Sequence, residues 1–158
     1  YPPHIEIKWD DSVWNNVSSL QEIDDSELFI NISNNRGEYN EGVINKFRVN
    51  VRPKYPKRTY KIKADNTLNY VLPENACYAI KDVSTNEYII NFDNKFTKLS
   101  CDKKGNFFNL YMEGLQPERY YEIIIKFELD EEVIVYNNKI YFKVKRNIYE
   151  SPYIPNMR

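Results

Sequence analysis

Apolar and polar residues alternate along most of this chain, with the period of two that places one side of a β-strand in a core. Before residue 55, two segments show this alternation clearly. Their apolar positions are Leu28, Ile30 and Ile32 in the first segment, and Phe47, Val49 and Val51 in the second. Both segments are predicted strands, and the polar residues 34–42 between them form a predicted loop.

The first residues of the chain are harder to interpret. Ile5, Ile7 and Trp9 alternate with polar residues, which predicts a strand that ends at Asp10. The residues after it allow either a loop or a short helix capped by Asp11 or Ser12. The apolar face of that helix would consist of Val13, Val17 and Leu20.

After residue 60, short alternating segments follow one another at regular spacing, separated by residues that favour turns. The predicted strands are residues 60–63, 77–83, 88–92, 107–112, 120–129, 133–136 and 139–145. Such a series is typical of an all-β sandwich or barrel. The segment Arg52–Arg58 contains Pro53 and Pro56, which cannot donate to a central sheet ladder. We interpret it as the end of one strand and a linker.

A turn near Gly114 is followed by Leu115, Pro117 and Tyr121 at a spacing that has structural meaning. A tyrosine that opens a strand after such a corner can bury its ring and donate its hydroxyl proton to the backbone of the corner. This tyrosine corner is a feature of Greek-key sandwiches. The chain is therefore predicted to be all-β, with a Greek-key sandwich as its main part.

The pattern divides the chain into three predicted parts. Residues 1–55 form a smaller, incomplete β module, because about three strands are few for an independent sandwich. That module would be completed by upstream residues, by the second module or by another chain. Residues 56–147 form the sandwich, and residues 148–158 form an extended tail whose apolar side chains need a surface to cover. The candidate interaction residues are Tyr149, Tyr153 and Ile154 on this tail, with Tyr55 and Tyr60 on the linker.

Composition agrees with this fold and limits the possible functions. Aromatic residues make up 15% of the chain, which suits half-buried strand surfaces. The net charge of −1 predicts no general attraction to polyanions or membranes, and no apolar run approaches the length of a membrane span. Two cysteines, Cys77 and Cys101, are too few for a disulfide scaffold, so we expect free thiols and assembly in a reducing cytosol.

Catalytic and metal-binding patterns are absent from the sequence. His4 is the single histidine, and together with two cysteines it matches no zinc spacing. Acidic residues adjacent to one another are expected in solvated turns, and they have no ligand spacing such as that of an EF-hand. These acidic groups are Asp10-Asp11, Asp24-Asp25 and residues 130–132. We expect no enzyme activity, no cofactor and no metal.

The densest basic segment is Arg52–Lys63, which holds six Lys or Arg residues with Tyr55 and Tyr60 between them. Basic residues interleaved with aromatic ones can follow a phosphate backbone. The alternative is a solvated linker and an edge strand, where lysines prevent sheet-to-sheet pairing. No nucleic-acid-binding fold accompanies the segment, so we favour this alternative and do not expect nucleic acid as a partner.

Residues 60–147 resemble a fibronectin type III domain or, more generally, an immunoglobulin-like domain. The resemblance rests on Leu110, Met112, Leu115, Pro117 and Tyr121 and on the alternating strand after them. The tryptophan that fibronectin type III domains carry in an early strand is absent, and so is the disulfide of antibody domains, which favours the wider immunoglobulin-like group.

Four short segments of the sequence also resemble structural proteins of tailed bacteriophages. They are residues 48–56, 96–108, 117–121 and 141–144. The resemblance implies a virion component of the head, neck or tail, assembled in the host cytoplasm in many symmetric copies, with other virion proteins as partners. It implies binding through β surfaces without catalysis. The alternative is a cell-surface adhesion or carbohydrate-binding module, which uses the same sandwich.

Overall fold

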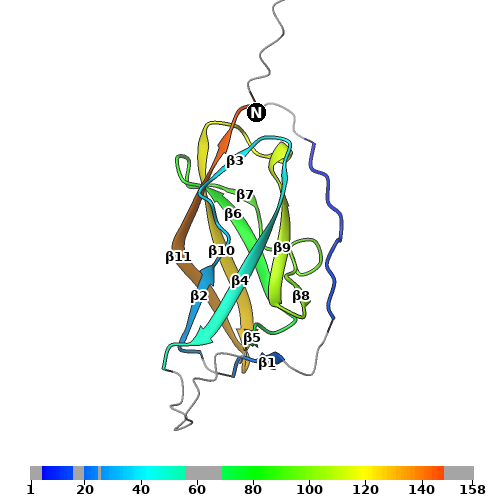
Figure 1. The fold of residues 1–158 in the computed structure, drawn as a ribbon, viewed down its shortest axis with the longest axis vertical. Helices are drawn as coiled ribbons and strands as arrows, with labels where there is room; N and C mark the ends of the chain where they lie inside the picture. Colours follow the sequence, from blue (N-terminus) through cyan, green and yellow to red (C-terminus); the bar gives the residue numbers. More distant parts are fainter. Residues whose placement is uncertain (1–4, 16–19, 25, 56–68, 148–158) are drawn as a thin grey trace, which may run out of the picture.

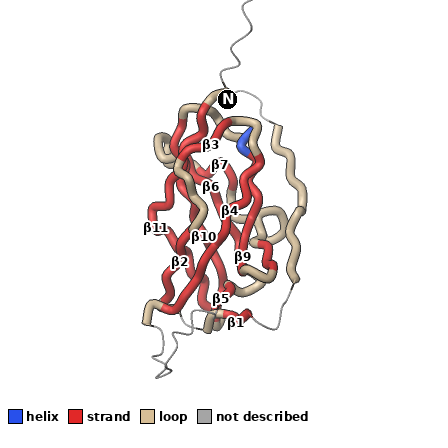
Figure 2. Tube along the Cα trace, viewed as in Figure 1, coloured by secondary structure: helices blue, strands red, loops and turns tan. Residues whose placement is uncertain are grey.

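The computed structural model describes residues 5–15, 20–24, 26–55 and 69–147. These residues form two β-sheets packed face to face and one turn of 3-10 helix, so the chain is all-β, as predicted (Figures 1 and 2). The elements are β1 (Leu20–Glu22), β2 (Leu28–Ile32), β3 (Glu38–Asn40), β4 (Ile44–Pro53), β5 (Asn69–Val71), β6 (Cys77–Asp82), β7 (Tyr88–Ile90), β8 (Ser100–Asp102), β9 (Gly105–Tyr111), η1 (Met112–Gly114), β10 (Arg119–Leu129) and β11 (Glu132–Lys145).

Strand β4 lies at the centre of the first sheet, because both of its edges are paired. β2 runs antiparallel along one edge and β9 along the other, so that Val49 is paired with Ile32 on one side and Asn106 on the other. β8 extends the sheet beyond β9. β5 pairs with β4 at Val51, beyond the residues of β4 that pair with β9. β1 pairs in parallel with β5.

The second sheet has the order β3-β11-β10-β6-β7. β6, β7, β10 and β11 pair with one another in antiparallel fashion, and β10 and β11 form a long hairpin. The hairpin turn is formed by Asp130 and Glu131, which have φ values of 50° and 64°. β3 pairs in parallel with the end of β11. The region that follows β3 crosses to the first sheet and becomes β4 (Figure 1).

The described residues of the two sheets share one hydrophobic core. Alternation along β4 directs Phe47, Val49 and Val51 inward, as predicted. Phe47 is fully buried, and its ring lies 5.3 Å from that of Phe108 on β9 and 5.7 Å from that of Phe142 on β11. Aromatic rings at these separations add to the free energy gained from burial alone. The core therefore joins both sheets through residues far apart in the sequence.

The predicted boundary at residue 55 is wrong, because the segments on its two sides form the same sandwich. β4 precedes the boundary and yet is the central strand of the first sheet, where it pairs with β9. The first module is thus completed by the second, which is one of the three possibilities that the sequence left open. Pro53 does end β4, as expected for a residue without an amide proton, but a strand end is not a domain end.

The predicted strand at Ile5–Asp10 is also wrong. These residues extend along the molecule without pairing in either described sheet, and the side chains of Ile5 and Ile7 are 92% and 74% exposed. Residues 11–15 are not helical: Trp14 makes an isolated parallel bridge to Cys101 instead. Alternation of apolar and polar residues shows that a segment could bury one side as a strand. It does not specify which other strand, if any, the segment pairs with.

The two strands predicted at residues 133–136 and 139–145 are one strand, β11. The pairing register with β10 shifts between Ile123 and Ile125, and Lys139 on β11 has a φ of 54°. Asn137 and Asn138, residues that favour turns and that separate the two predicted strands, therefore lie at an irregularity inside one strand. The predicted strand at 60–63 and the predicted tail at 148–158 lie outside the described residues.

Candidate interaction surfaces

The tyrosine corner fixes the start of β10. Tyr121 is buried, and its hydroxyl donates a hydrogen bond to the carbonyl oxygen of Gln116 at 2.9 Å. Its ring stacks on Phe142 with a centroid separation of 5.6 Å, and Leu115 is buried beside it. Burial raises the pKa of Tyr121, so its hydroxyl keeps the proton that it donates. The corner predicted from Leu115, Pro117 and Tyr121 is present.

An ion pair lies close to this corner. The carboxylate of Asp82, at the end of β6, is almost fully buried and lies 2.7 Å from the guanidinium of Arg119. Burial by itself would raise the pKa of Asp82, but hydrogen bonds from Arg119 and from the amides of Ser84 and Thr85 lower it below its ordinary value. Arg119 and Asp82 neutralise each other's charge, so we assign this ion pair a structural role, which is to hold the turn between β6 and β7.

The outer face of the second sheet exposes large apolar side chains. Tyr120 points outward because its neighbour Tyr121 points inward, and pairing places Tyr141, Val135 and Val133 on the same side. The members of this surface, which we call the β10–β11 face, are Tyr88, Tyr120, Val133, Val135 and Tyr141. Tyr120, Val133 and Val135 are 54%, 60% and 53% exposed. The sequence did not distinguish these positions from the core.

Residues in the middle of this face are already shielded from solvent. Ile124 and Ala79 point outward and are paired across β10 and β6, yet they are only 1% and 0% exposed. Lysine side chains lie over aromatic rings around them: Lys126 lies 4.9 Å from the ring centre of Phe92 and Lys81 lies 5.8 Å from that of Tyr88. The β10–β11 face is therefore an ordered surface with a packed centre and a tyrosine- and valine-rich rim.

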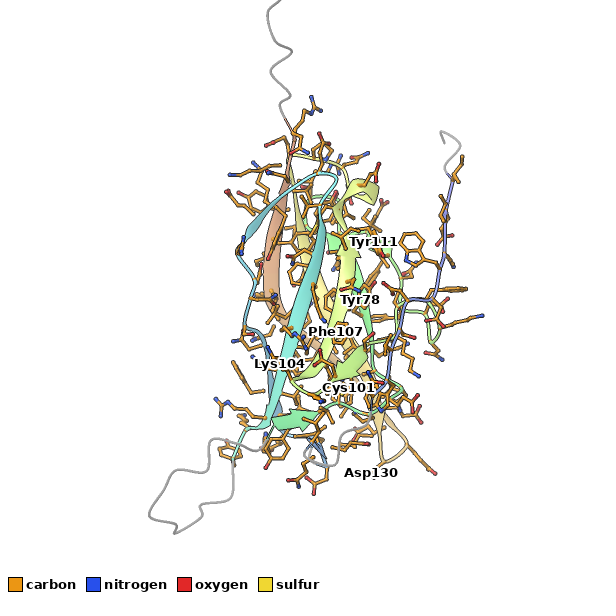
Figure 3. The ribbon with its side chains drawn as sticks, turned by 45° about the vertical axis from the view of Figure 1, so that its right-hand side comes forward. Tyr78, Cys101, Lys104, Phe107, Tyr111 and Asp130 are labelled. Carbon is orange, nitrogen blue, oxygen red and sulfur yellow. The ribbon has the colours of Figure 1, made fainter. Side chains whose placement is uncertain are left out.

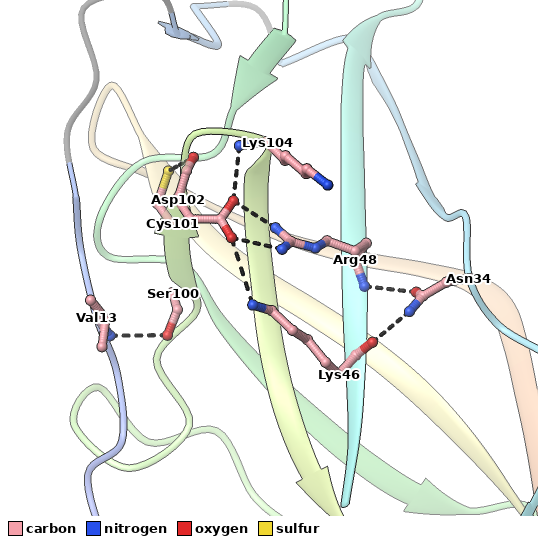
Figure 4. Close-up of polar contacts among 8 residues, drawn as sticks. All are labelled: Val13, Asn34, Lys46, Arg48, Ser100, Cys101, Asp102 and Lys104. Atoms are coloured by element: carbon pink, nitrogen blue, oxygen red, sulfur yellow. Dashed lines mark hydrogen bonds and ion pairs between the residues drawn. The ribbon is translucent and has the colours of Figure 1, made fainter.

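The outer face of the first sheet has a different character, built around Asp102 at the end of β8. The guanidinium of Arg48 on β4 binds this carboxylate through two hydrogen bonds, of 2.6 and 2.7 Å, and Lys46 lies 3.6 Å away from it (Figure 4). Both cations also lie over the ring of Phe107 on β9. The Asn34 side chain joins the backbone of Lys46 and Arg48.

Asp102 makes the stability of this cluster dependent on pH. Its hydrogen bond from Arg48 is the main reason that the pKa of Asp102 is lowered to about 2. A carboxylate with a lowered pKa in the folded state stabilises the fold above its unfolded pKa, and this contribution is lost as the pH falls through the folded pKa. Between pH 5 and pH 2 we expect Asp102 to account for a loss on the order of 1–2 kcal/mol, reduced by its partial exposure.

The comparison that isolates this contribution is between the wild type and Asp102→Asn. An asparagine can still accept the hydrogen bond from the Lys104 amide, but it has no charge to lose. Urea unfolding at a series of pH values should show the variant less stable at pH 5 and equal to the wild type near pH 2. Parallel pH profiles for the two proteins would contradict the assignment.

The N-terminal segment lies along the free edge of β8 (Figure 3). The amide of Cys101 donates to the Val13 carbonyl at 2.9 Å, and the amide of Asn15 donates to the Cys101 carbonyl at 3.1 Å. Closer to the N-terminus, the ring of Trp9 packs edge-on against the ring of Tyr111, with 4.8 Å between the ring centres. The segment thus covers an edge that would otherwise leave backbone groups unpaired.

Among the predicted interaction residues, Tyr55 lies within the described part of the chain. It lies just beyond Lys54 after the end of β4, its side chain is exposed, and the amino group of Lys54 lies 5.5 Å from its ring centre. The others, Tyr60, Tyr149, Tyr153 and Ile154, lie outside the described residues, as does His4.

Cys77 and Cys101 are free thiols, and both are buried. Burial raises the pKa of each thiol, which keeps it in the less reactive protonated form. No group of three or more potential metal ligands lies together in the described part of the chain. Within the same residues, no helix is long and apolar enough to cross a membrane.

Comparison with known proteins gives no relative of this chain: no family model, no curated protein and no solved structure matches it.

Proposed function

We propose that this chain is a non-enzymatic structural protein that binds neighbouring subunits through a face of its sandwich, and that its place is in the particle of a tailed bacteriophage. The observation that carries the proposal is the β10–β11 face, where three tyrosines and two valines are exposed on one ordered sheet surface. Tyrosine gives large amphipathic contacts and is enriched at protein interfaces.

The order of the strands supports an immunoglobulin-like sandwich as the scaffold for this role. Constant-type immunoglobulin domains place strands ABED in one sheet and CFG in the other, and variable-type domains add C′ next to C. Here β2-β4-β9-β8 corresponds to ABED, and β11-β10-β6-β7 corresponds to GFCC′. The tyrosine corner lies before β10, the strand that corresponds to F. Such sandwiches act through grafted surfaces, since the fold by itself has no active site.

The bacteriophage assignment adds to this the resemblance of residues 48–56, 96–108, 117–121 and 141–144 to virion proteins. Under this assignment the partners are other virion subunits in a symmetric, multi-copy assembly, and the protein is located in the virion. A ring or tube of subunits requires contacts that repeat from copy to copy, and a flat sheet face provides them without rearrangement of the fold.

The test is the mass of the purified chain in solution at increasing concentration. We expect a concentration-dependent rise above the monomer mass, which Val135→Lys weakens by about tenfold or more because it places a charge in the contact. Ile44→Lys is the matched control: it introduces the same charge at an exposed β-branched residue on the first sheet, and it should leave association unchanged.

A different result would favour the adhesion or carbohydrate-binding function. If the chain stays monomeric at every concentration and binds a glycan saturably on an array, the proposal is wrong. Neighbouring reading frames give an independent check, because portal, capsid or tail genes beside this one are expected if it encodes a virion protein.

A further inference from the structure

Strand β4 carries a row of positive charges on the outer face of the first sheet. Its inward residues fill the core, so the residues that alternate with them point to the opposite side: Lys46, Arg48, Asn50 and Arg52, three of which are cations. Alternate residues of a strand are about 7 Å apart, so this row extends over roughly 20 Å. Lys54 continues the row just beyond the end of β4.

The position of β4 removes the simplest explanation for these charges. Lysines on an edge strand prevent unwanted pairing between sheets, which was the reason to expect a solvated linker at this point of the chain. β4, however, is an inner strand: β9 pairs with its residues 44–49 and β2 with its residues 49–53, and the Asn34 side chain binds the backbone of Lys46 and Arg48 on the side that β2 does not reach. Protection of a free edge therefore does not account for Lys46, Arg48 or Arg52.

More positive charges lie next to this row, in the tight turn between β8 and β9. Lys103 and Lys104 are both exposed there, and the side chain of Lys104 extends from the turn toward β4 (Figure 4). The cations of this surface, which we call the β4 face, are Lys46, Arg48, Arg52, Lys54, Lys103 and Lys104. Asp102 neutralises part of the charge at Arg48 and Lys46. Glu27 lies opposite Lys54, and Asp11 contacts Asn109, the residue paired with Lys46, but the six cations outnumber these three carboxylates. The chain as a whole has a net charge of −1, so its charges are segregated.

The aromatic residues of the β4 face limit what it can bind. Phe107, in its middle, is buried beneath Lys46 and Arg48, so its ring is not available for stacking. The middle of the face therefore lacks the exposed apolar centre that protein interfaces usually have. Phe29 on β2 is 39% exposed on the same side, and the guanidinium of Arg52 lies over its ring at 5.0 Å. A partner that matches the face presents a line of negative charges and needs no apolar contact, which is the chemistry of a phosphodiester backbone.

We propose that the β4 face binds a nucleic-acid strand through its phosphates, without reading its base sequence. This inference does not depend on the proposed function, because it concerns the other sheet and a different kind of partner. The row on β4 follows the backbone, and the turn lysines contact it from the side of β8.

The experiment measures binding of the full chain to fluorescently labelled, mixed-sequence DNA, single-stranded and duplex, over a range of salt concentrations. We expect an affinity that falls steeply with salt, with a slope of about −0.9 per phosphate contact for duplex DNA. Arg52→Gln combined with Lys54→Gln should flatten this slope by about 2 and weaken binding to every sequence alike. Lys139→Asn, a loss of charge on the second sheet at a position whose φ suits asparagine, is the control and should change neither.

Asp102→Asn tests the same surface in the opposite direction. It removes the carboxylate that holds Arg48 and Lys46, so it should tighten binding and steepen the salt slope by about 1. Its circular dichroism is compared with that of the wild type to confirm that it is folded. Absence of salt-dependent DNA binding overturns the proposal, and so does an equal loss in Lys139→Asn and in the Arg52/Lys54 variant. Competition by a polyglutamate peptide as effective as that by DNA would assign the face to acidic protein segments and overturn it as well.

Discussion

Phe47→Ala is expected to destabilise the whole chain by about 3–5 kcal/mol, the usual loss when a buried phenylalanine is truncated. Phe47 is fully buried on the central strand β4, and its ring contacts those of Tyr39, Phe108 and Phe142. These partners come from both sheets and from both sides of residue 55. Because one core holds them, a cavity at Phe47 should weaken every strand together, in a single cooperative transition.

Urea unfolding followed by far-ultraviolet circular dichroism, with amide hydrogen exchange to resolve individual strands, is the appropriate measurement. Phe29→Ala is the matched control, since Phe29 lies on the adjacent strand β2 and points to the outer face. We expect that variant to lose less than about 1 kcal/mol. Two separate transitions, with only the first shifted by Phe47→Ala, would show that residues 1–55 and 56–147 have independent cores and would contradict the single sandwich.

The strands themselves could be predicted from the sequence because alternation is a local signal. β2 and β4 were both predicted from three apolar positions each, and those positions point into the core. The assembly of the strands could not be predicted in the same way. Val49 pairs with Asn106, far along the chain, and nothing in either local pattern specifies that neighbour. The prolines after β4 therefore suggested a domain boundary that does not exist.

The candidate surfaces were missed for a related reason. Val133 and Val135 point outward while Ile134 and Tyr136 point inward, so both sides of that strand are apolar and the sequence cannot show which is exposed. The cations of β4 do alternate with its core residues and could have been recognised. Their significance depends on β4 being central and not at an edge, and that fact belongs to the topology.

The tyrosine corner could be predicted because its parts are close together in the sequence. Gln116 and Tyr121 are five residues apart, and the turn between them brings the hydroxyl to the carbonyl with little freedom left to the chain. In a local motif of this kind, the sequence itself shows which backbone group accepts the hydrogen bond of the tyrosine. The motif also sets which residues of β10 point inward, and so it places Tyr120 on the β10–β11 face.

Tyr121→Ala is expected to cost about 3–5 kcal/mol, because it removes a buried ring that stacks on Phe142 together with the hydrogen bond to Gln116. Tyr121→Phe separates these two contributions. It keeps the ring and removes the donor, and since Gln116 lies at the surface its carbonyl can bind water instead. We therefore expect a loss of only about 1 kcal/mol for Tyr121→Phe.

Tyr120→Phe is the control for the corner, since it removes the same hydroxyl from the adjacent residue, which points outward and is half exposed. Its stability should stay within about 0.5 kcal/mol of the wild type. Thermal and urea unfolding of the three variants measure the loss of stability in each. We expect the largest loss for the Tyr121 ring, a smaller one for the Tyr121 hydroxyl and the smallest for the Tyr120 hydroxyl. If Tyr121→Phe cost as much as Tyr121→Ala, the hydrogen bond would dominate the corner. If it cost no more than Tyr120→Phe, the ring alone would hold β10 in register, and the hydroxyl would have no measurable role.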